Sequence, residues 1–487
     1  MKEMEQKPPY MMIAILFVGA FVAFLNNTLL NVALPTISVE FDVTPATVQW
    51  LTTGYMLVNG ILIPASAFFV QKFTNRKLYI TAMAFFTVGT LIAAVAPEFW
   101  VLLVARMIQA AGSAMMMPLL MNVLLTAFPI ERRGAAMGMF GLVMIMAPAI
   151  GPTLSGLIIE HYDWRVLFQL VLPFAVIVLV LAIFKLRNIT PNTDVKLDVT
   201  SLAFSSIGFG GLLYGFSSAG EKGWDAPIVY GTIILGFVSL ILFVVRQLKL
   251  EEPMLDVRIY KYPMFALASV ISVVVSAAMF SGMILTPFYV QMIRGISPFH
   301  SGLLMLPGAI LMGIMSPITG RLFDKYGART LAAIGLTITT IATYLMSNLD
   351  MESGYFYIMA VYTIRMFGMS MVMMPIMTNG LNQLPMNKNP HGTALNNTLQ
   401  QVSGAIGSAI FLTIMNSKLE STAEKLFADA TAAGEVPTAA DALTQFTNQI
   451  SAQAMLEGIN FTFFIATIVT VVALILSLFV KRVVVSR

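Results

Sequence analysis

The sequence contains no cysteine and few charged residues, and both absences restrict what the protein can be. Without cysteine it has no disulfide framework, no thiol nucleophile and no thiolate metal site. Charged residues make up 11% of the chain, whereas a soluble globular domain carries about 25%. The three histidines, His161, His300 and His391, are too scattered to predict a metal cluster. We therefore expect neither a bound metal nor a cofactor.

Long apolar runs dominate what is present. Of the 487 residues, 58% are hydrophobic, including 35 methionines and 34 phenylalanines. Because a helix needs about 20 apolar residues to cross a bilayer, these runs predict an all-α polytopic membrane protein surrounded by lipid. We count about fourteen spans, at residues 11–34, 47–70, 78–96, 100–124, 135–159, 164–184, 200–218, 228–245, 264–292, 300–319, 330–348, 354–377, 391–415 and 458–480.

The basic residues are sorted between the two sides of the membrane. If the N-terminus is cytoplasmic, roughly 21 of the 28 Lys and Arg residues fall in segments on that side, and about five on the other. This distribution follows the positive-inside rule and predicts that both termini are cytoplasmic. Since the charges do not form a compact basic face, we expect no nucleic-acid partner.

The chain repeats itself. Arg106 and Arg365 each lie in an apolar run and are followed, in the same order, by a methionine cluster and a proline. The stretch from Pro64 to Arg76 also aligns with the stretch from Pro317 to Arg329 at a constant offset. Spans 1–6 therefore match spans 9–14 in parallel orientation, which leaves spans 7 and 8 as an inserted hairpin.

The repeat predicts three parts: a six-helix bundle at 1–184, a linker with the inserted hairpin at 185–263, and a second six-helix bundle at 264–487. Parallel halves related by an axis along the membrane normal are typical of transporters, whose substrate site lies between the halves. Within the second half, residues 416–456 form a long outer segment with apolar residues at helical spacing. We favour an amphipathic helix pair lying on the outer membrane surface; the alternative is a lid over the outer mouth.

Polar residues inside the spans are few enough to be candidates for a substrate or coupling site. A charge at membrane depth is costly, so an intramembrane arginine is a functional hypothesis by default. Amides in membrane helices can instead join neighbouring helices, for about 0.6 kcal/mol each, and methionine can be a merely apolar residue or part of an adaptable binding surface. The candidates are Arg106, Gln109, Asn26, Asn27, Asn31, Asn59, Asn122, Met117, Arg365, Asn396, Asn397 and Gln400.

Arg106 has the strongest case. Span 1 runs outward and span 4 runs inward, so that the upper part of span 1 and the start of span 4 overlap in depth. We therefore expect Arg106, Asn26, Asn27 and Gln109 to form the polar floor of a cavity in the outer half. All 24 acidic residues lie in loops or at span ends, so no carboxylate in a span interior is available to pair with this guanidinium.

The stretch from Gly320 to Arg329 resembles the cytoplasmic signature of the major facilitator superfamily. The resemblance implies that the glycines allow a tight turn and that Asp324 latches an inner gate, by holding either the adjacent arginines or a neighbouring helix N-terminus. In the first-half copy Ala67, Gln71 and Thr74 occupy the positions where the signature has Gly, Asp and Gly. The implied gate residues are Gly320, Arg321, Asp324, Gly327, Arg329 and Arg76.

Further motifs resemble those of the fourteen-span drug:proton antiporter branch of this superfamily. They are Leu25–Pro35 in span 1, Arg106–Gly112 in span 4, Ala147–Gly156 in span 5 and Trp164–Phe168 at the entry to span 6. The span-5 motif is similar to the branch's antiporter signature, with Pro148, Gly151, Pro152 and Gly156 as its characteristic residues. The resemblance extends over residues 11–480, and the most similar group is the lincomycin-resistance-type multidrug efflux pumps of Gram-positive bacteria.

This resemblance implies a monomeric transporter in a bacterial plasma membrane that exports amphipathic drugs by alternating access, with the proton as coupling ion. Asn26 replaces the aspartate that the branch has in span 1, which leaves a span-end acid or a loop histidine to take the proton, or weakens coupling. The alternative is an exporter of an endogenous lipid, nucleotide or metabolite with weak or unusual coupling. An enzyme is not expected, because no catalytic triad or metal-ligand spacing occurs.

Overall fold

The computed structural model describes residues 9–43, 45–48, 50–129, 132–189, 198–251, 253–434, 436–437 and 440–482. These parts of the chain are helical and contain no strand. In order, the elements are α1 (Tyr10–Glu40), α2 (Pro45–Val48), α3 (Trp50–Lys72), α4 (Asn75–Ala94), α5 (Phe99–Ala127), α6 (Arg133–His161), α7 (Arg165–Lys185), α8 (Val199–Lys222), α9 (Pro227–Lys249), η2 (Val257–Lys261), α10 (Pro263–Phe288), η3 (Tyr289–Ile293), α11 (Pro298–Tyr326), α12 (Ala328–Met346), α13 (Tyr355–Ser370), α14 (Met373–Asn382), η4 (Met386–Lys388), α15 (Asn389–Ala433) and α16 (Ala440–Ser477).

Among the described residues, 12 helices are long and apolar enough to cross a membrane, or 13 if the bent α3 is counted as one span. The helix α6 is 29 residues long, and its apolar stretch is shorter than the others. With α6 included, the structure is compatible with the predicted count of about fourteen spans. One predicted span, 354–377, is broken, because α13 ends at Ser370 and α14 begins at Met373.

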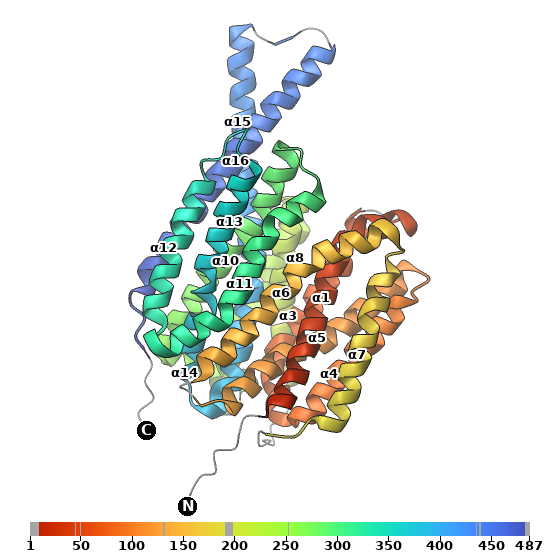
Figure 1. The fold of residues 1–487 in the computed structure, drawn as a ribbon, viewed down its shortest axis with the longest axis vertical. Helices are drawn as coiled ribbons and strands as arrows, with labels where there is room; N and C mark the ends of the chain where they lie inside the picture. The colour runs from red at the N-terminus through yellow and green to blue at the C-terminus, as the bar shows by residue number, and fades with distance from the viewer. Residues whose placement is uncertain are drawn as a thin grey trace, which may run out of the picture.

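The bundle is organised around contacts between helices far apart in the sequence. Helix α6 packs along α11, and α15 packs against α3 and α5. The inserted hairpin joins through α8, which contacts both α3 and α15. Helices α1 and α16 begin and end, respectively, at the same end of the bundle (Figure 1). The division of the chain at 184 and 263 stays a prediction; α7 ends at Lys185 and α10 begins at Pro263.

The crossing of α6 and α11 depends on residues without side chains. A β-carbon added to Gly138 would overlap the carbonyl oxygen of Ser316 and lie 2.9 Å from Cα of Pro317. One added to Gly320 would overlap the carbonyl of Gly134. Small residues let membrane helices approach this closely.

The segment 416–456 does not lie on a membrane surface, and this expectation was wrong. Helix α15 is 45 residues long, and it continues beyond the bundle beside α16 as a projecting hairpin (Figure 1). The rings of Phe427 and Phe446 pack against each other with centroids 6.4 Å apart. The apolar stripe is therefore used between the two helices, and the described part of the hairpin does not fold back as a lid.

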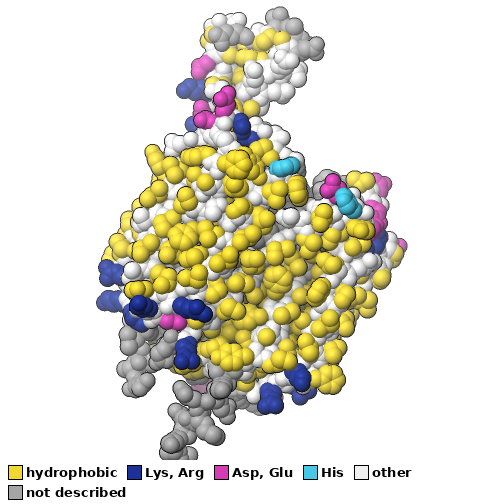
Figure 2. Space-filling model, viewed as in Figure 1, with side chains coloured by type: hydrophobic (Ala, Val, Ile, Leu, Met, Phe, Trp, Pro, Cys, Tyr) yellow, Lys and Arg dark blue, Asp and Glu magenta, His cyan; other side chains and the backbone are white. Residues whose placement is uncertain are grey.

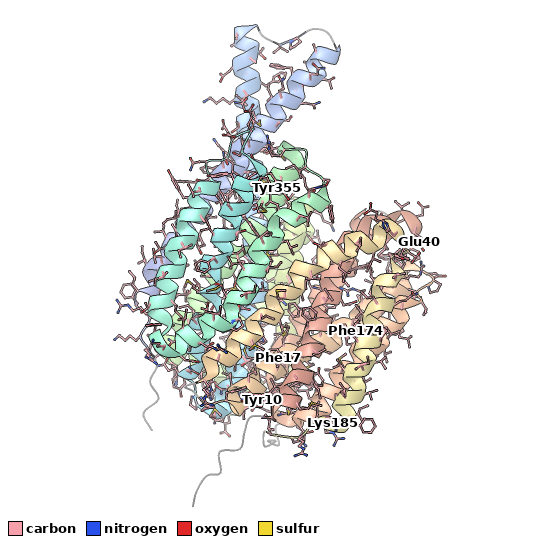
Figure 3. All side chains as sticks on the ribbon, in the orientation of Figure 1. Tyr10, Phe17, Glu40, Phe174, Lys185 and Tyr355 are labelled. Atoms are coloured by element: carbon pink, nitrogen blue, oxygen red, sulfur yellow. The ribbon has the colours of Figure 1, made fainter. Side chains whose placement is uncertain are left out.

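The outer surface of the bundle is a broad band of apolar side chains (Figure 2). On α9, Ile234, Leu235 and Ile241 are 55–61% exposed, which is favourable only against lipid hydrocarbon. Lys and Arg gather at the end of the bundle where α1 begins (Figure 2). Figure 3 places Tyr10 and Lys185 at that end and Glu40 at the other. The chain is a multi-pass membrane protein.

Candidate functional site

A network of hydrogen bonds surrounds Arg106 on α5. Its guanidinium donates from Nη1 to Gln109 Oε1 at 2.8 Å, from Nη2 to Asn27 Oδ1 at 2.9 Å, and from Nε to the carbonyl of Leu51 at 3.4 Å. The ring of Tyr55 lies over the guanidinium, with its centroid 4.2 Å from Cζ. The side chain of Arg106 is fully buried. Helices α1, α3 and α5 thus meet at one cation.

The network extends to α4 through Gln109. Its Nε2 donates to Thr90 Oγ1 at 2.8 Å, and its Oε1 also accepts from Asn26 Nδ2 at 3.2 Å. In the described part of the chain, every hydrogen-bond partner of the Arg106 guanidinium is neutral. Hydrogen bonds to a charged group contribute about 1.5–3 kcal/mol each, which offsets only part of the cost of burying the charge.

The predicted contact between Arg106, Gln109, Asn26 and Asn27 is confirmed, but the predicted cavity floor is not what the structure contains. Arg106 and Gln109 are 0% exposed and Asn26 is 2% exposed. Arg106, Gln109 and Asn26 therefore form a closed polar core, and the half-buried Asn27 lies at its edge. The side chain of Asn31 lies outside the described residues.

Asn59 is linked to this core through residues that the sequence interpretation missed. The Tyr55 hydroxyl donates to Ser113 Oγ at 2.6 Å, and Ser113 Oγ lies 3.3 Å from Asn59 Oδ1. The missed signal was spacing, because Tyr55 precedes Asn59 by one helical turn and Ser113 follows Arg106 by two turns on the same face.

Two further candidates on α5 do not join the network. Asn122 is buried and Met117 is half-buried. Since an α-helix rises about 1.5 Å per residue, Asn122 stands roughly 24 Å along α5 from Arg106.

Arg365 is the counterpart of Arg106 in the second half, and its surroundings differ. Its Nε donates to Thr343 Oγ1 at 3.1 Å, and Nη2 donates to the carbonyl of Ala278 and lies 3.5 Å from Ser281 Oγ. Nη1 is buried and has no hydrogen-bond partner among the described residues. No amide side chain takes part in these contacts. The two sites therefore both contain a buried arginine but differ in the residues that bind it.

On α15 the candidate amides face a methionine. Asn396 donates from Nδ2 to Met377 Sδ at 2.7 Å, and Gln400 Nε2 lies 3.9 Å from the same sulfur. Asn397 Nδ2 is buried without a hydrogen-bond partner in the described chain.

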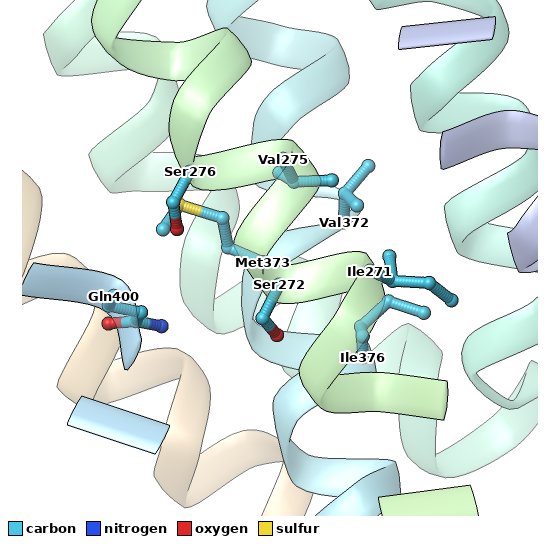
Figure 4. A pocket seen from close by; sticks show the side chains of 8 residues that line it. All are labelled: Ile271, Ser272, Val275, Ser276, Val372, Met373, Ile376 and Gln400. Atoms are coloured by element: carbon cyan, nitrogen blue, oxygen red, sulfur yellow. The ribbon is translucent and has the colours of Figure 1, made fainter. Parts of the chain in front are cut away.

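Gln400 also lines a small cavity. It faces residues of α10 and the start of α14 across a space of about 10 Å³, lined by Ile271, Ser272, Val275, Ser276, Val372, Met373, Ile376 and Gln400 (Figure 4). This volume holds about one water molecule, whereas a pocket for a drug-sized ligand measures about 300–1,000 Å³. This conformation therefore leaves no room for a drug at this cavity.

The candidate gate is built on a helix N-terminus. The Asp324 carboxylate accepts from the backbone N–H groups of Gly134 at 2.9 Å and Ala135 at 3.1 Å. It thus caps the first turn of α6, where N–H groups lack partners within the helix and the dipole favours an anion. Of the two expected arrangements, pairing with Arg321 or Arg329 was wrong; both arginines are exposed to the surroundings.

The other gate residues have separate roles in the packing. Gly327 adopts φ +81° between α11 and α12, which is the tight turn expected from the signature. Gly320 lies within α11 at the crossing with α6, so it permits close approach rather than a turn. Arg76 donates from Nη2 to the carbonyl of Ile183 at 2.6 Å, at the end of α7, and takes no part in the Asp324 contact.

The antiporter-like motif of α6 packs on α1 beside the Arg106 network. A β-carbon on Gly151 would overlap Oγ1 of Thr28, and Thr28 Oγ1 donates to the carbonyl of Ala147 at 3.3 Å. A β-carbon on Gly156 would meet nothing within 4 Å. The side chains of Pro148 and Pro152 lie outside the described residues.

Comparison with known proteins gives consistent results. The family model of the Major Facilitator Superfamily matches residues 16–408. An uncharacterized MFS-type transporter of Bacillus subtilis, YhcA, is 50% identical over 86% of this chain and 78% of its own length. The lincomycin resistance protein LmrB of the same organism is 44% identical over 97% of this chain and 95% of its own.

Among solved structures, the human organic anion transporter MFSD10 has a similar fold. The TM-score is 0.63 at 12% sequence identity, over 96% of this chain and 100% of the other. At this level of identity the similarity concerns the fold alone.

Proposed function

Because the chain belongs to the major facilitator superfamily, and is therefore a transporter and not an enzyme, we propose that it is a multidrug efflux pump. It exports amphipathic small molecules across the plasma membrane of a bacterium by alternating access and is driven by proton influx. It works as a monomer with both termini in the cytoplasm. Proteins of 42–44% identity over 97% of this chain carry the name lincomycin resistance protein, so lincomycin is the first substrate to test.

The observation that carries this proposal is the buried Arg106 with its neutral partners. An uncompensated cation is costly at membrane depth, and such residues mark substrate or ion pathways. Its partners come from α1 and α3 as well as α5, so movement of these helices would uncover hydrogen-bonding groups. The exposed guanidinium would attract an anionic or acceptor-rich molecule and repel a cation. We therefore propose neutral or anionic amphiphiles as the preferred substrates.

Alternating access requires the two halves to separate at one end and close at the other. Asp324 on α11 and the start of α6 hold one end closed through their hydrogen bonds. The absence of a drug-sized space beside Gln400 fits a closed stage of this cycle.

The test is export of lincomycin from reconstituted vesicles with an imposed pH gradient, with lumen pH recorded by a dye in the same experiment. We expect lincomycin movement coupled to proton movement, and loss of export by at least about tenfold in Arg106→Ala, equivalent to about 1.4 kcal/mol. Arg187→Ala, at an exposed arginine after α7, is the control and should transport normally. Normal export by Arg106→Ala would make the central role of this network wrong.

The second candidate function is export of an endogenous lipid, nucleotide or metabolite with weak coupling. It is favoured by Asn26, a neutral residue where the resembled antiporters have an aspartate, and by the lack of acidic residues inside the predicted spans. If lincomycin and related drugs do not move while lumen pH also stays constant, this second function is preferred.

A further inference from the structure

A second polar junction joins distant parts of the chain at the start of α15. The backbone N–H of Asp256, in the linker before α10, donates to Nδ1 of His391 at 3.2 Å. On the other side of the ring, Nε2 of His391 lies 3.2 Å from the side-chain amide nitrogen of Gln71, at the end of α3. The Asp256 carboxylate also accepts from Lys388 Nζ at 2.9 Å. We call Gln71, Asp256, Lys388 and His391 the histidine latch.

The geometry of the histidine latch fits a neutral ring. Since Nδ1 accepts a backbone N–H, it cannot carry a proton, and Nε2 must carry the ring hydrogen. The side-chain nitrogen of Gln71 also donates to the carbonyl of Ala67 at 3.0 Å. Turning this amide by half a turn would present its oxygen to the ring hydrogen and give up that bond. A second proton on Nδ1 would face the N–H of Asp256, and this hydrogen bond would be lost.

The charged groups near the His391 ring come from several elements. His391 is 7% exposed, and Asp256 and Lys388 are the charged groups that act on it most directly. On α3, Lys72 is the residue next to Gln71, and Arg258 in the linker directs its guanidinium to the carbonyls of Leu248 and Leu250.

The Asp256 carboxyl is already committed to its own partner. Burial works to raise its pKa, but the hydrogen bonds from Lys388 and from the backbone of Arg258 outweigh burial and lower the pKa. An imidazolium would therefore meet a carboxylate that Lys388 already holds.

The histidine latch joins three parts of the chain that the repeat separates. It connects α3 of the first half, the linker of the inserted hairpin and α15 of the second half. Gln71 occupies, in the first half of the repeat, the position that Asp324 occupies in the second. Asp324 caps α6 with a charge, whereas Gln71 meets the start of α15 through a neutral amide and a titratable ring. The Asp324 contact therefore contains no ring that could take up a proton, whereas the Gln71 contact includes the titratable ring of His391.

We propose that His391 is a proton-binding site and that its protonation releases the start of α15 from α3 and the linker. A solvated histidine takes up a proton at about pH 6.5, while the closed latch needs the neutral ring. The closed arrangement is therefore stable above that pH and loses stability as the pH falls through it. This inference extends the proposed proton-coupled function but does not depend on which molecule is exported.

The experiment uses the natural absence of cysteine. A single cysteine is placed by Ala394→Cys, at a residue of α15 that is 0% exposed in the closed structure. The rate of its reaction with a small thiol reagent, corrected for the pH dependence of the reagent with an exposed cysteine in Ser421→Cys, measures opening. We expect the corrected rate to rise at least about tenfold from pH 8 to pH 5.5.

His391→Asn keeps an acceptor near the position of Nδ1 and cannot take up a proton in this range. It should remain closed, with a corrected rate that does not change with pH. His300→Gln, at an exposed histidine at the other end of the molecule, should respond like the parent. If His391→Asn retains the pH response, or if the parent shows none, the histidine latch is not the proton site.

Folding and function are checked separately. Each variant is first shown to be monodisperse in detergent at pH 8. Because labelling needs no substrate, a normal pH response together with failure to export lincomycin would reject the proposed function and keep the latch. Export of lincomycin, together with a labelling rate of Ala394→Cys that does not change with pH, would keep the proposed function and reject the latch.

Discussion

Arg106 gives its N–H groups to amide and carbonyl oxygens rather than to a carboxylate. Such a group keeps its full charge without the partner that would neutralise it. Asn26 is linked to this cation through Gln109, because its Nδ2 donates to the same Gln109 oxygen that accepts from Arg106. The selectivity of the site for charge should therefore depend on position 26.

Asn26→Asp should shift preference toward cationic drugs and strengthen the dependence of export on the pH gradient. The new carboxylate would offset the guanidinium charge and add a group that can titrate. Export of a cationic dye, relative to that of lincomycin, should rise by roughly tenfold, measured in vesicles with and without the gradient. Asn26→Ala, which removes the amide without adding charge, should not show this shift. Unchanged selectivity in Asn26→Asp would show that position 26 does not set the charge preference of the site.

At the scale of helices, the contact between α6 and α11 combines a capping carboxylate with glycines at a close crossing. The carboxylate of Asp324 ends on backbone N–H groups of the partner helix, while Gly138 and Gly320 let the backbones meet. The two features affect different properties. The Asp324 cap should affect the rate of opening, and the glycines at the crossing should affect stability.

Asp324→Asn should slow export by roughly tenfold while leaving substrate affinity nearly unchanged. The amide keeps one acceptor oxygen but loses the charge that favours a helix N-terminus, which contributes about 0.3–1 kcal/mol and up to about 2 kcal/mol where it is partly buried. Export rates in vesicles and lincomycin binding in detergent distinguish the two effects. Asp225→Asn, an exposed acid between α8 and α9, is the control. An equal loss of export and affinity would place Asp324 at the substrate.

Gly138→Ala should lower the unfolding temperature, whereas Gly156→Ala, on the same helix, should leave it unchanged or raise it slightly. At Gly138 the new methyl group meets the backbone of Ser316 and Pro317, while at Gly156 it meets nothing within 4 Å. Overpacking costs about 1–3 kcal/mol, and alanine is favoured over glycine within a helix by about 1 kcal/mol. Thermal unfolding in detergent measures both; similar values would show that the crossing tolerates a side chain.

At the scale of the whole molecule, positive charges gather at the end where α1 begins, and they indicate which end of the bundle faces the cytoplasm (Figure 2). Lys and Arg are retained on the cytoplasmic side of a membrane. The projecting part of α15 and α16 extends from the opposite end (Figure 1), so it should face the exterior.

Reporter fusions after residues 190 and 430 should report the cytoplasm and the exterior, respectively. The expectation follows from the charge distribution and from the direction of the hairpin. Activity of an enzyme reporter that folds on only one side of the membrane is the measurement. Both fusions reporting the same side would contradict the topology and the placement of both termini in the cytoplasm.

The sequence alone determined the class of this protein and the pairing of Arg106 with Asn27 and Gln109. Apolar runs must be buried in lipid, and residues at i and i+3 on a helix share a face, as Arg106 and Gln109 do. The contact with Asn27 was expected because spans 1 and 4 run in opposite directions and overlap in depth. The repeat likewise predicted parallel halves and a transporter, and the family comparison shows a transporter.

Only the tertiary structure decided which partners the remaining polar groups take. Asp324 binds a helix N-terminus and not the nearby arginines, and His391 contacts Gln71, which lies 320 positions away in the chain. The apolar residues of 416–456 pack against a partner helix, where the sequence led us to expect a membrane surface. In each case several partners satisfy the same local chemistry, and the packing of helices distant in the sequence selects among them.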